Sequence, residues 1–139
     1  RICGNRFEGT NIYKRGEYYY LFASIGTCCN GATSTYQTVV GRSKNVLGPY
    51  LDKTGRDMLY DYCEIIMSGN ETWAGPGHNS ILIQDDVGTD WIIYHGYKKK
   101  EAENGRYVLM DKLIWSNDGW PSVKSNAPSI LEVAPYFQK

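Results

Sequence analysis

The sequence predicts an all-β chain in which one four-stranded antiparallel unit occurs twice. Twelve tyrosines and four tryptophans among 139 residues are typical of β-rich proteins. Fifteen glycines and five prolines place turn signals along the whole chain, which favours many short strands over long helices. The same order of strand, tight turn, apolar strand, loop and strand recurs after about 70 residues.

The first unit begins with a strand over residues 10–14, which a glycine turn joins to the apolar strand 17–24. After a loop at 26–33, the β-branched residues of 34–43 predict a third strand. Gly48-Pro49-Tyr50 then turns the chain into a shorter fourth strand.

The second unit repeats this order. Its strands are expected over 80–83, 90–97 and 106–115. A turn at 116–119 leads into a short fourth strand over 120–123.

A repeated four-stranded antiparallel unit indicates the blades of a β-propeller. The approximate blades are 1–72 and 73–127, and a closing strand is expected over 128–139. Two blades do not close a propeller, so we expect the missing blades from a longer polypeptide or from a companion chain. A self-contained two-sheet β-sandwich is the structural alternative.

Charge and hydropathy exclude two classes of partner. Fifteen basic and fifteen acidic residues cancel, which argues against nucleic acid. The run Lys98-Lys99-Lys100 is followed at once by Glu101 and Glu103 and predicts a solvated turn. Apolar runs such as 91–94 have the length of buried strands and are too short to span a membrane.

The four cysteines lack the spacing of a zinc site. Cys28 and Cys29 are adjacent, and a vicinal disulfide and two buried thiols both fit. The chain begins at Arg1 without a methionine or a secretory signal, so we expect an interior segment or a processed product.

Glu8 is the first candidate catalytic residue, because it stands between Phe7 and Gly9 just before a strand. An apolar neighbour raises the pKa of a carboxyl group, and a glycine lets a substrate approach the backbone. His78 occupies the equivalent place in the second unit. Because innermost strands line the channel of a propeller, we expect both side chains to face one axial cavity.

Several motifs carry a family resemblance along nearly the whole chain. They are Phe7-Glu8-Gly9, Ile12-Tyr13-Lys14-Arg15, Tyr18-Tyr19-Tyr20-Leu21-Phe22, Cys28-Cys29-Asn30-Gly31, Ser34-Thr35-Tyr36, Val40-Gly41-Arg42-Ser43, Gly48-Pro49-Tyr50, Gly75-Pro76-Gly77-His78-Asn79 and Tyr94-His95-Gly96-Tyr97. With these residues the chain resembles the C-terminal part of the endo-acting arabinanases of glycoside hydrolase family 43. The resemblance implies about two blades of a five-bladed β-propeller.

The resemblance also implies an inverting mechanism with three acidic residues on the propeller axis. Only the general acid maps here, onto Glu8, and the base and a pKa-tuning aspartate are expected in earlier blades. Inversion places the acid and the base roughly 6.5 to 9.5 Å apart on opposite faces of the sugar. The acid must stay protonated near neutral pH, and both Phe7 and a nearby carboxylate would raise its pKa.

By the same resemblance, His78 holds a calcium or sodium ion at the channel centre, with water completing its shell. Imidazole is an unusual calcium ligand, and the alternative is a histidine that hydrogen-bonds its own loop. Four further residues are expected near the substrate: Thr27, Cys28, Ser34 and Tyr36. Packing explains Cys28 and Tyr36 equally well.

Other polar residues are assigned structural roles. His95 lies within an apolar run and is interpreted as a core histidine without a catalytic role. Asp57, Asp85 and Asp86 are expected to be turn residues.

The leading functional hypothesis is endo-hydrolysis of α-1,5-L-arabinofuranosidic links in arabinan, with this chain supplying the acid. An exo-acting α-L-arabinofuranosidase or β-xylosidase of the same family is one alternative. A non-catalytic carbohydrate-binding propeller segment is another. A polymeric substrate implies a secreted, periplasmic or cell-surface protein.

Overall fold

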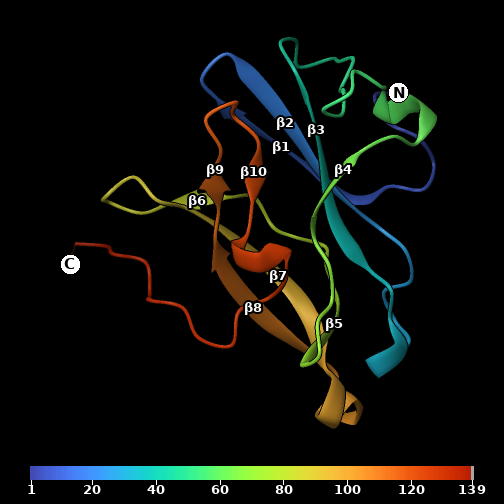
Figure 1. The fold of residues 1–139 in the computed structure, drawn as a ribbon, viewed down its shortest axis with the longest axis vertical. Coiled ribbons are helices and arrows are strands. Elements are labelled where there is room, and N and C mark those ends of the chain that lie inside the picture. The colour runs from blue at the N-terminus through green and yellow to red at the C-terminus, as the bar shows by residue number, and fades with distance from the viewer. Residues whose placement is uncertain (139) are drawn as a thin grey trace.

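Two four-stranded antiparallel sheets, accompanied by one two-stranded sheet, pack against each other in the computed structural model, which describes residues 1–138 (Figure 1). The first sheet contains β1 (Glu8–Arg15), β2 (Tyr18–Ile25), β3 (Gln37–Ser43) and β4 (Glu64–Met67). Each strand pairs with the next one in the chain. The first three strands are therefore confirmed, because local turns and apolar runs define them.

The prediction of a fourth strand directly after Gly48-Pro49-Tyr50 is wrong, because β4 begins only at Glu64. Leu51 forms only isolated bridges, to Arg42 and Asp57. The carboxylate of Asp52 then accepts hydrogen bonds from backbone amides four residues or fewer ahead and folds a turn. A 3-10 helix over Met58–Tyr60 follows before the chain returns to pair with β3.

The second sheet centres on β7 (Asp90–Lys98). One edge of β7 pairs with β5 (Trp73–Gly77) and β6 (Ile83–Gln84), and the other pairs with β8 (Arg106–Lys112). Two short strands therefore share one edge, with a break between them. The strand expected over 80–83 is misplaced, because the first strand of this unit is β5. Residues 75–77, Gly-Pro-Gly, are typical of a turn but here belong to that strand.

The strands predicted for the end of the second unit also differ from the structure. The expected strand 106–115 breaks at Leu113, whose amide donates to the carbonyl of Asp90 and whose side chain is buried. The chain resumes as β9 (Ile114–Trp115), which pairs with β10 (Pro121–Ser122) across the expected turn. The fourth strand is thus short and pairs with β9 rather than with β8.

No strand forms over residues 128–138, so the closing strand expected over 128–139 is absent from this described part, and residue 139 lies outside it. Backbone amides of this segment bond to carboxylates instead of to a neighbouring strand. Ser129 donates to Asp111, and Tyr136 donates to Asp85. The blade boundaries stay a prediction.

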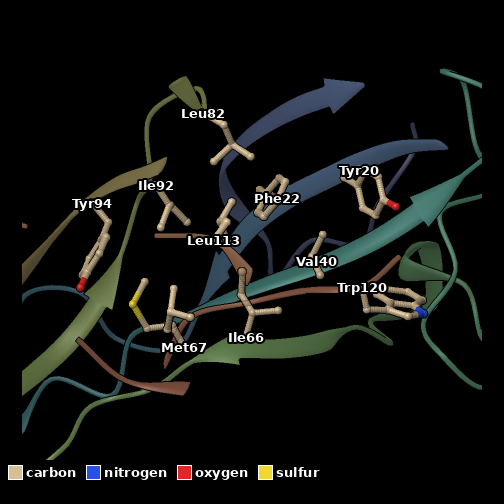
Figure 2. Close-up of a cluster of buried hydrophobic side chains, with 11 residues drawn as sticks. Tyr20, Phe22, Val40, Ile66, Met67, Leu82, Ile92, Tyr94, Leu113 and Trp120 are labelled. Atoms are coloured by element: carbon tan, nitrogen blue, oxygen red, sulfur yellow. The ribbon is translucent and has the colours of Figure 1, made fainter. Parts of the chain in front are cut away.

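A hydrophobic cluster fills the space between the two sheets (Figure 2). The first sheet contributes Phe22 and Val40, and the second contributes Ile92 and Tyr94. A second cluster covers the other face of the first sheet and includes Phe7, Leu21 and Met58, among others. No helix among residues 1–138 is long and apolar enough to cross a membrane.

Candidate active site

Glu8 is the first residue of β1, and its side chain is exposed. It pairs opposite Ser24 of β2. Phe7 is 9% exposed and belongs to the second hydrophobic cluster, so it anchors the start of the strand in the core.

His78 follows β5 directly and lies beside β1. Its backbone amide donates a 2.7 Å hydrogen bond to the hydroxyl of Ser24. Gly9 has a φ of +58°, and a Cβ atom there would come within 3.0 Å of the His78 ring. A glycine is therefore required where β1 passes the imidazole. This close approach brings the loop of His78 against the strand that carries Glu8.

Tyr36 connects these residues from the entry to β3, and its side chain is fully buried. Its hydroxyl lies 3.5 Å from Nδ1 of His78. Burial raises the pKa of the Tyr36 phenol, and the neighbouring Glu8 carboxylate raises it further. Tyr36 is therefore a neutral hydrogen-bond donor over the working pH range of most enzymes.

His95 belongs to the same cluster, although the sequence places it in an apolar run. Its ring stacks with Tyr36 at 5.9 Å and with His78 at 6.1 Å between centroids. Its Nδ1 atom is buried without a partner among the described residues. Burial, followed by the charges of Arg106 and His78, lowers its pKa. The neutral form is thus favoured. His95 reaches this cluster because it pairs opposite Gly77 of β5, which no sequence signal indicates.

The remaining predicted residues lie on the loop between β2 and β3. Thr27 is exposed, and its hydroxyl bonds to that of Thr35 at 2.9 Å. Cys28 is half-buried and forms a disulfide with Cys29. Ser34 is 8% exposed, and its hydroxyl accepts a hydrogen bond from the amide of Asn30 at 2.9 Å.

A ligand could therefore touch Thr27 and Cys28, whose contact with substrate stays a prediction. Ser34 and Tyr36 are buried among the described residues, and the substrate contact expected of them also stays a prediction. Of the two states expected for Cys28 and Cys29, a vicinal disulfide or two buried thiols, this structure contains the disulfide.

A second loop borders this one. The 3-10 helix Gly31–Thr33 packs beside the segment Lys99–Asn104 at one end of the molecule (Figure 1). Lys98 pairs with Glu101 at 2.6 Å, and the hydroxyl of Tyr107 donates to the same carboxylate. Lys99 and Lys100 are exposed, as expected of a solvated run, and Lys98 pairs with Glu101, so this segment forms an internally bonded rim beside the helix Gly31–Thr33.

Metal binding has limited support in the described residues. Among residues 1–138, no three His, Cys, Asp or Glu side chains gather to hold an ion. His78 alone offers one imidazole nitrogen, whereas calcium and sodium prefer oxygen ligands.

Asp57 and Asp85 are turn residues, as predicted, because each accepts a hydrogen bond from a backbone amide two residues ahead.

Comparisons with known proteins agree on one family. A family model described as glycosyl hydrolases family 43 matches residues 4–121. The chain is 45% identical over 118 residues to an extracellular exo-α-(1→5)-L-arabinofuranosidase of Cellvibrio japonicus, covering 85% of this chain and 33% of that protein. It is 41% identical over 120 residues to an extracellular endo-α-(1→5)-L-arabinanase of Bacillus subtilis, covering 86% and 35%.

Solved structures are similar as well. An α-L-arabinanase of Cellvibrio cellulosa complexed with arabinohexaose matches with a TM-score of 0.80 and 44% identity, over 86% of this chain and 37% of that one. An endo-arabinanase of Bacillus licheniformis matches with a TM-score of 0.77 and 37% identity, over 86% and 39%. The predicted fold, about two blades of a five-bladed propeller, is confirmed. The chain spans about a third of the length of the curated relatives it matches.

Proposed function

The chain belongs to glycosyl hydrolases family 43, and on that premise we propose that it supplies the general acid of an enzyme that hydrolyses arabinan with inversion. One observation carries this proposal: Glu8 is exposed at the start of β1, where this strand passes His78. A carboxylic acid in this place is free to reach a bound sugar. The family membership supplies the reaction class, glycoside hydrolysis.

In this mechanism Glu8 protonates the oxygen of the departing arabinosyl residue. A second carboxylate, on the opposite face of the sugar, activates water. We propose that this base and a third, pKa-tuning aspartate belong to the blades that the chain does not span. Those blades are the expected partner, as a preceding segment or as a companion chain.

His78 is proposed as the one ligand from this chain to a calcium or sodium ion on the axis, with water in the other positions. Such a cation would supply positive charge beside the sugar. The residues around His78 hold its ring whether or not an ion is bound, since Ser24 fixes its backbone and Gly9 packs against its imidazole.

Internal cleavage of α-1,5 links is the leading form of this activity, and arabinan is the proposed substrate. Exo-acting arabinofuranosidase activity is a second candidate, which the Cellvibrio japonicus relative favours. Loops at the ends of the cleft decide between the two, because a blocked end permits cleavage only from a chain terminus. Secretion fits a substrate too large to enter a cell, and both relatives are named extracellular.

The experiment that tests this proposal uses the assembled enzyme and linear α-1,5-arabinan. Early products are separated by length, and the anomeric configuration of the first product is followed by proton NMR. We expect a mixture of internal fragments that are released with inverted configuration. Single arabinose units would favour exo action, retention would contradict the mechanism, and binding without cleavage would favour the carbohydrate-binding alternative.

A further inference from the structure

We propose that a cavity beside Arg42 is a second carbohydrate site, which binds an acidic sugar, such as a uronic acid residue, through its carboxylate. This inference goes beyond the proposed function, because it assigns binding without cleavage to a part of the chain remote from Glu8. The cavity has a volume of about 440 Å³, which lies within the range of sites for small molecules. Its walls include Tyr18, Arg42, Lys44, Asn45, Lys53 and Trp120.

This cavity lies at the opposite end of the first sheet from Glu8. Glu8 pairs with Ser24 at one end of β1, whereas Arg15 pairs with Tyr18 at the other. The eight residues of this strand separate the two ends by about 23 Å. In Figure 1 the turn between β9 and β10 lies at this far end, away from the segment Lys99–Asn104. A ligand in the cavity therefore leaves the place where Glu8 acts unoccupied.

The walls of the cavity come from both described sheets. Arg42 lies two residues after Val40 on β3, so its side chain points to the same face of the first sheet. Tyr18 packs against the hydrophobic cluster on this face, and Trp120 joins that cluster from the second sheet. The cavity thus lies at the end of the contact between the two sheets. These walls need no residue from the blades that the chain does not span.

The guanidinium of Arg42 is held in a fixed place. Its central carbon lies 4.4 Å from the ring centroid of Tyr18 and 4.4 Å from that of Trp120. Its Nη1 atom also donates a 2.5 Å hydrogen bond to the carbonyl of Asp118. A guanidinium has five N–H donors in a planar fork, and stacking on aromatic rings leaves its edge free to bind a carboxylate at two points. Arg42 is therefore already oriented for a ligand carboxylate.

The cavity carries a positive charge. Lys44 and Lys53 join Arg42 in its walls, and the one acidic residue among the described wall residues is Asp52. The carboxylate of Asp52 is fully buried and pairs with Arg56 at 2.9 Å, so its charge is already neutralised. Within residues 1–138, neither Arg42 nor Lys53 forms an ion pair.

Three further carboxylates lie next to these basic residues. Glu17 pairs with Lys44 at 3.5 Å, but both side chains are mostly exposed, so this pair contributes little and a ligand can replace it. Glu64 accepts a hydrogen bond from the backbone amide of Lys53. The carboxylate of Asp118 accepts one from a neighbouring serine hydroxyl. The side-chain charges of Arg42 and Lys53 are therefore available to an anion.

The polar groups of the cavity favour an acidic sugar over a small inorganic anion. Asn45 lies in the wall, and its Oδ1 atom accepts a 3.0 Å hydrogen bond from the amide of Leu47. This bond fixes the side chain and leaves its NH2 group to donate to a hydroxyl. A uronic acid residue supplies both partners, because it has a carboxylate for Arg42 and ring hydroxyls for Asn45. Phosphate supplies only the anion.

Calorimetric titration of the assembled enzyme with a trimer of α-1,4-linked galacturonic acid tests this site. We expect saturable binding that weakens as salt is added, because exposed charges are screened. Arg42→Lys keeps the charge but loses the fork, and it should weaken binding by about tenfold. Lys53→Gln removes an exposed charge and should weaken binding by about two- to fivefold.

Lys100→Gln is the matched control, because it also removes one exposed positive charge but belongs to the segment at the other end of the molecule. It should bind the trimer as the wild type does. The methyl ester of the trimer keeps the rings without the charge and should not bind. If Arg42→Lys does not fold, Lys44→Gln combined with Lys53→Gln decides the result, since both side chains are exposed.

An absence of saturable binding by the wild type, or equal weakening by Lys100→Gln, would overturn the site. Equal affinity for the methyl ester would overturn the role of the carboxylate. Competition by inorganic phosphate at the concentrations at which the trimer binds would overturn the assignment to a sugar.

Glu8→Gln separates this proposal from the proposed function. It should bind the trimer as tightly as the wild type while it loses hydrolysis of arabinan. If Glu8→Gln still hydrolyses arabinan and binds the trimer, only the proposed function fails. If Glu8→Gln loses hydrolysis but Arg42→Lys and Lys53→Gln bind the trimer like the wild type, only the second site fails.

Discussion

The phenol of Tyr13 donates a 2.7 Å hydrogen bond to the carboxylate of Asp90, which joins β1 of the first sheet to β7 of the second. The same carboxylate accepts a 2.7 Å bond from the indole of Trp115 and lies 3.4 Å from Arg15. Its side chain is 1% exposed. Asp90 therefore links the two sheets through a buried charge that is neutralised and hydrogen-bonded.

Replacing this carboxylate should destabilise the fold more than replacing any one of its partners. Asp90→Ala leaves several half-buried donors without an acceptor, and we expect a loss of about 2 to 3 kcal/mol in the free energy of unfolding. Tyr13→Phe removes only one donor and should cost about 1 to 2 kcal/mol. Denaturant unfolding of the assembled protein measures both. Equal effects of the two variants would contradict the central position of Asp90.

Stability should also fall at high pH through the same pair. Burial, together with the hydrogen bond to Asp90, raises the pKa of Tyr13 to about 12. Because this pKa is higher in the folded state than in the unfolded state, the stabilisation that the protonated phenol provides is fully present below pH 10. It is lost between pH 10 and about 12. Thermal midpoints across this range should fall less steeply for Tyr13→Phe than for the wild type. Parallel curves would refute the assignment.

Gly77→Ala should disturb the site through packing. The added methyl would lie 2.5 Å from the ring of Tyr36 and 3.0 Å from the hydroxyl of Ser24, and neither residue has room to move. We expect a loss of about 1 to 3 kcal/mol of stability. Gly88→Ala is a useful contrast, because its Cβ would meet open space and its cost would come only from a φ of +83°. The site is packed less tightly than described if Gly77→Ala proves as stable as the wild type.

The proposed ion site predicts that the enzyme binds calcium through His78, and this binding can be measured without substrate. Calorimetric titration of the metal-free assembled enzyme with calcium should give saturable binding, and His78→Gln should weaken it by at least tenfold. Lys99→Gln, on the rim of the loop, should leave binding unchanged. Identical calcium titrations for His78→Gln and the wild type would exclude His78 as a ligand, and a response to sodium alone would identify the ion as sodium.

The local parts of this fold could be predicted from the sequence. Strands β1 to β3 follow from a glycine turn and two runs of apolar or β-branched residues, which act over short distances. The place of β4 depends instead on turns that the side chains of Asp52 and Asp57 fold. Such turns cannot be read from hydrophobic periodicity.

The site was predicted less completely, for a related reason. The sequence places Glu8 and His78 about 70 residues apart and just before an expected strand in each unit, which predicted a common location. In the structure Glu8 begins β1 whereas His78 follows the end of β5, so the two places are not equivalent. His95 was assigned to the core because an apolar run surrounds it. Its approach to Tyr36 and His78 follows from the pairing of β5 with β7, which no local pattern encodes.

The most direct test of the central claim is the hydrolysis of linear arabinan by the assembled enzyme carrying Glu8→Gln. We predict a loss of about 10²- to 10⁴-fold in kcat with oligosaccharide binding retained within a few fold, because glutamine keeps the shape of the side chain but cannot supply the proton. Glu17→Gln, at an exposed position in the turn between β1 and β2, should retain full activity. Undiminished hydrolysis by Glu8→Gln would contradict the assignment of Glu8 as the general acid.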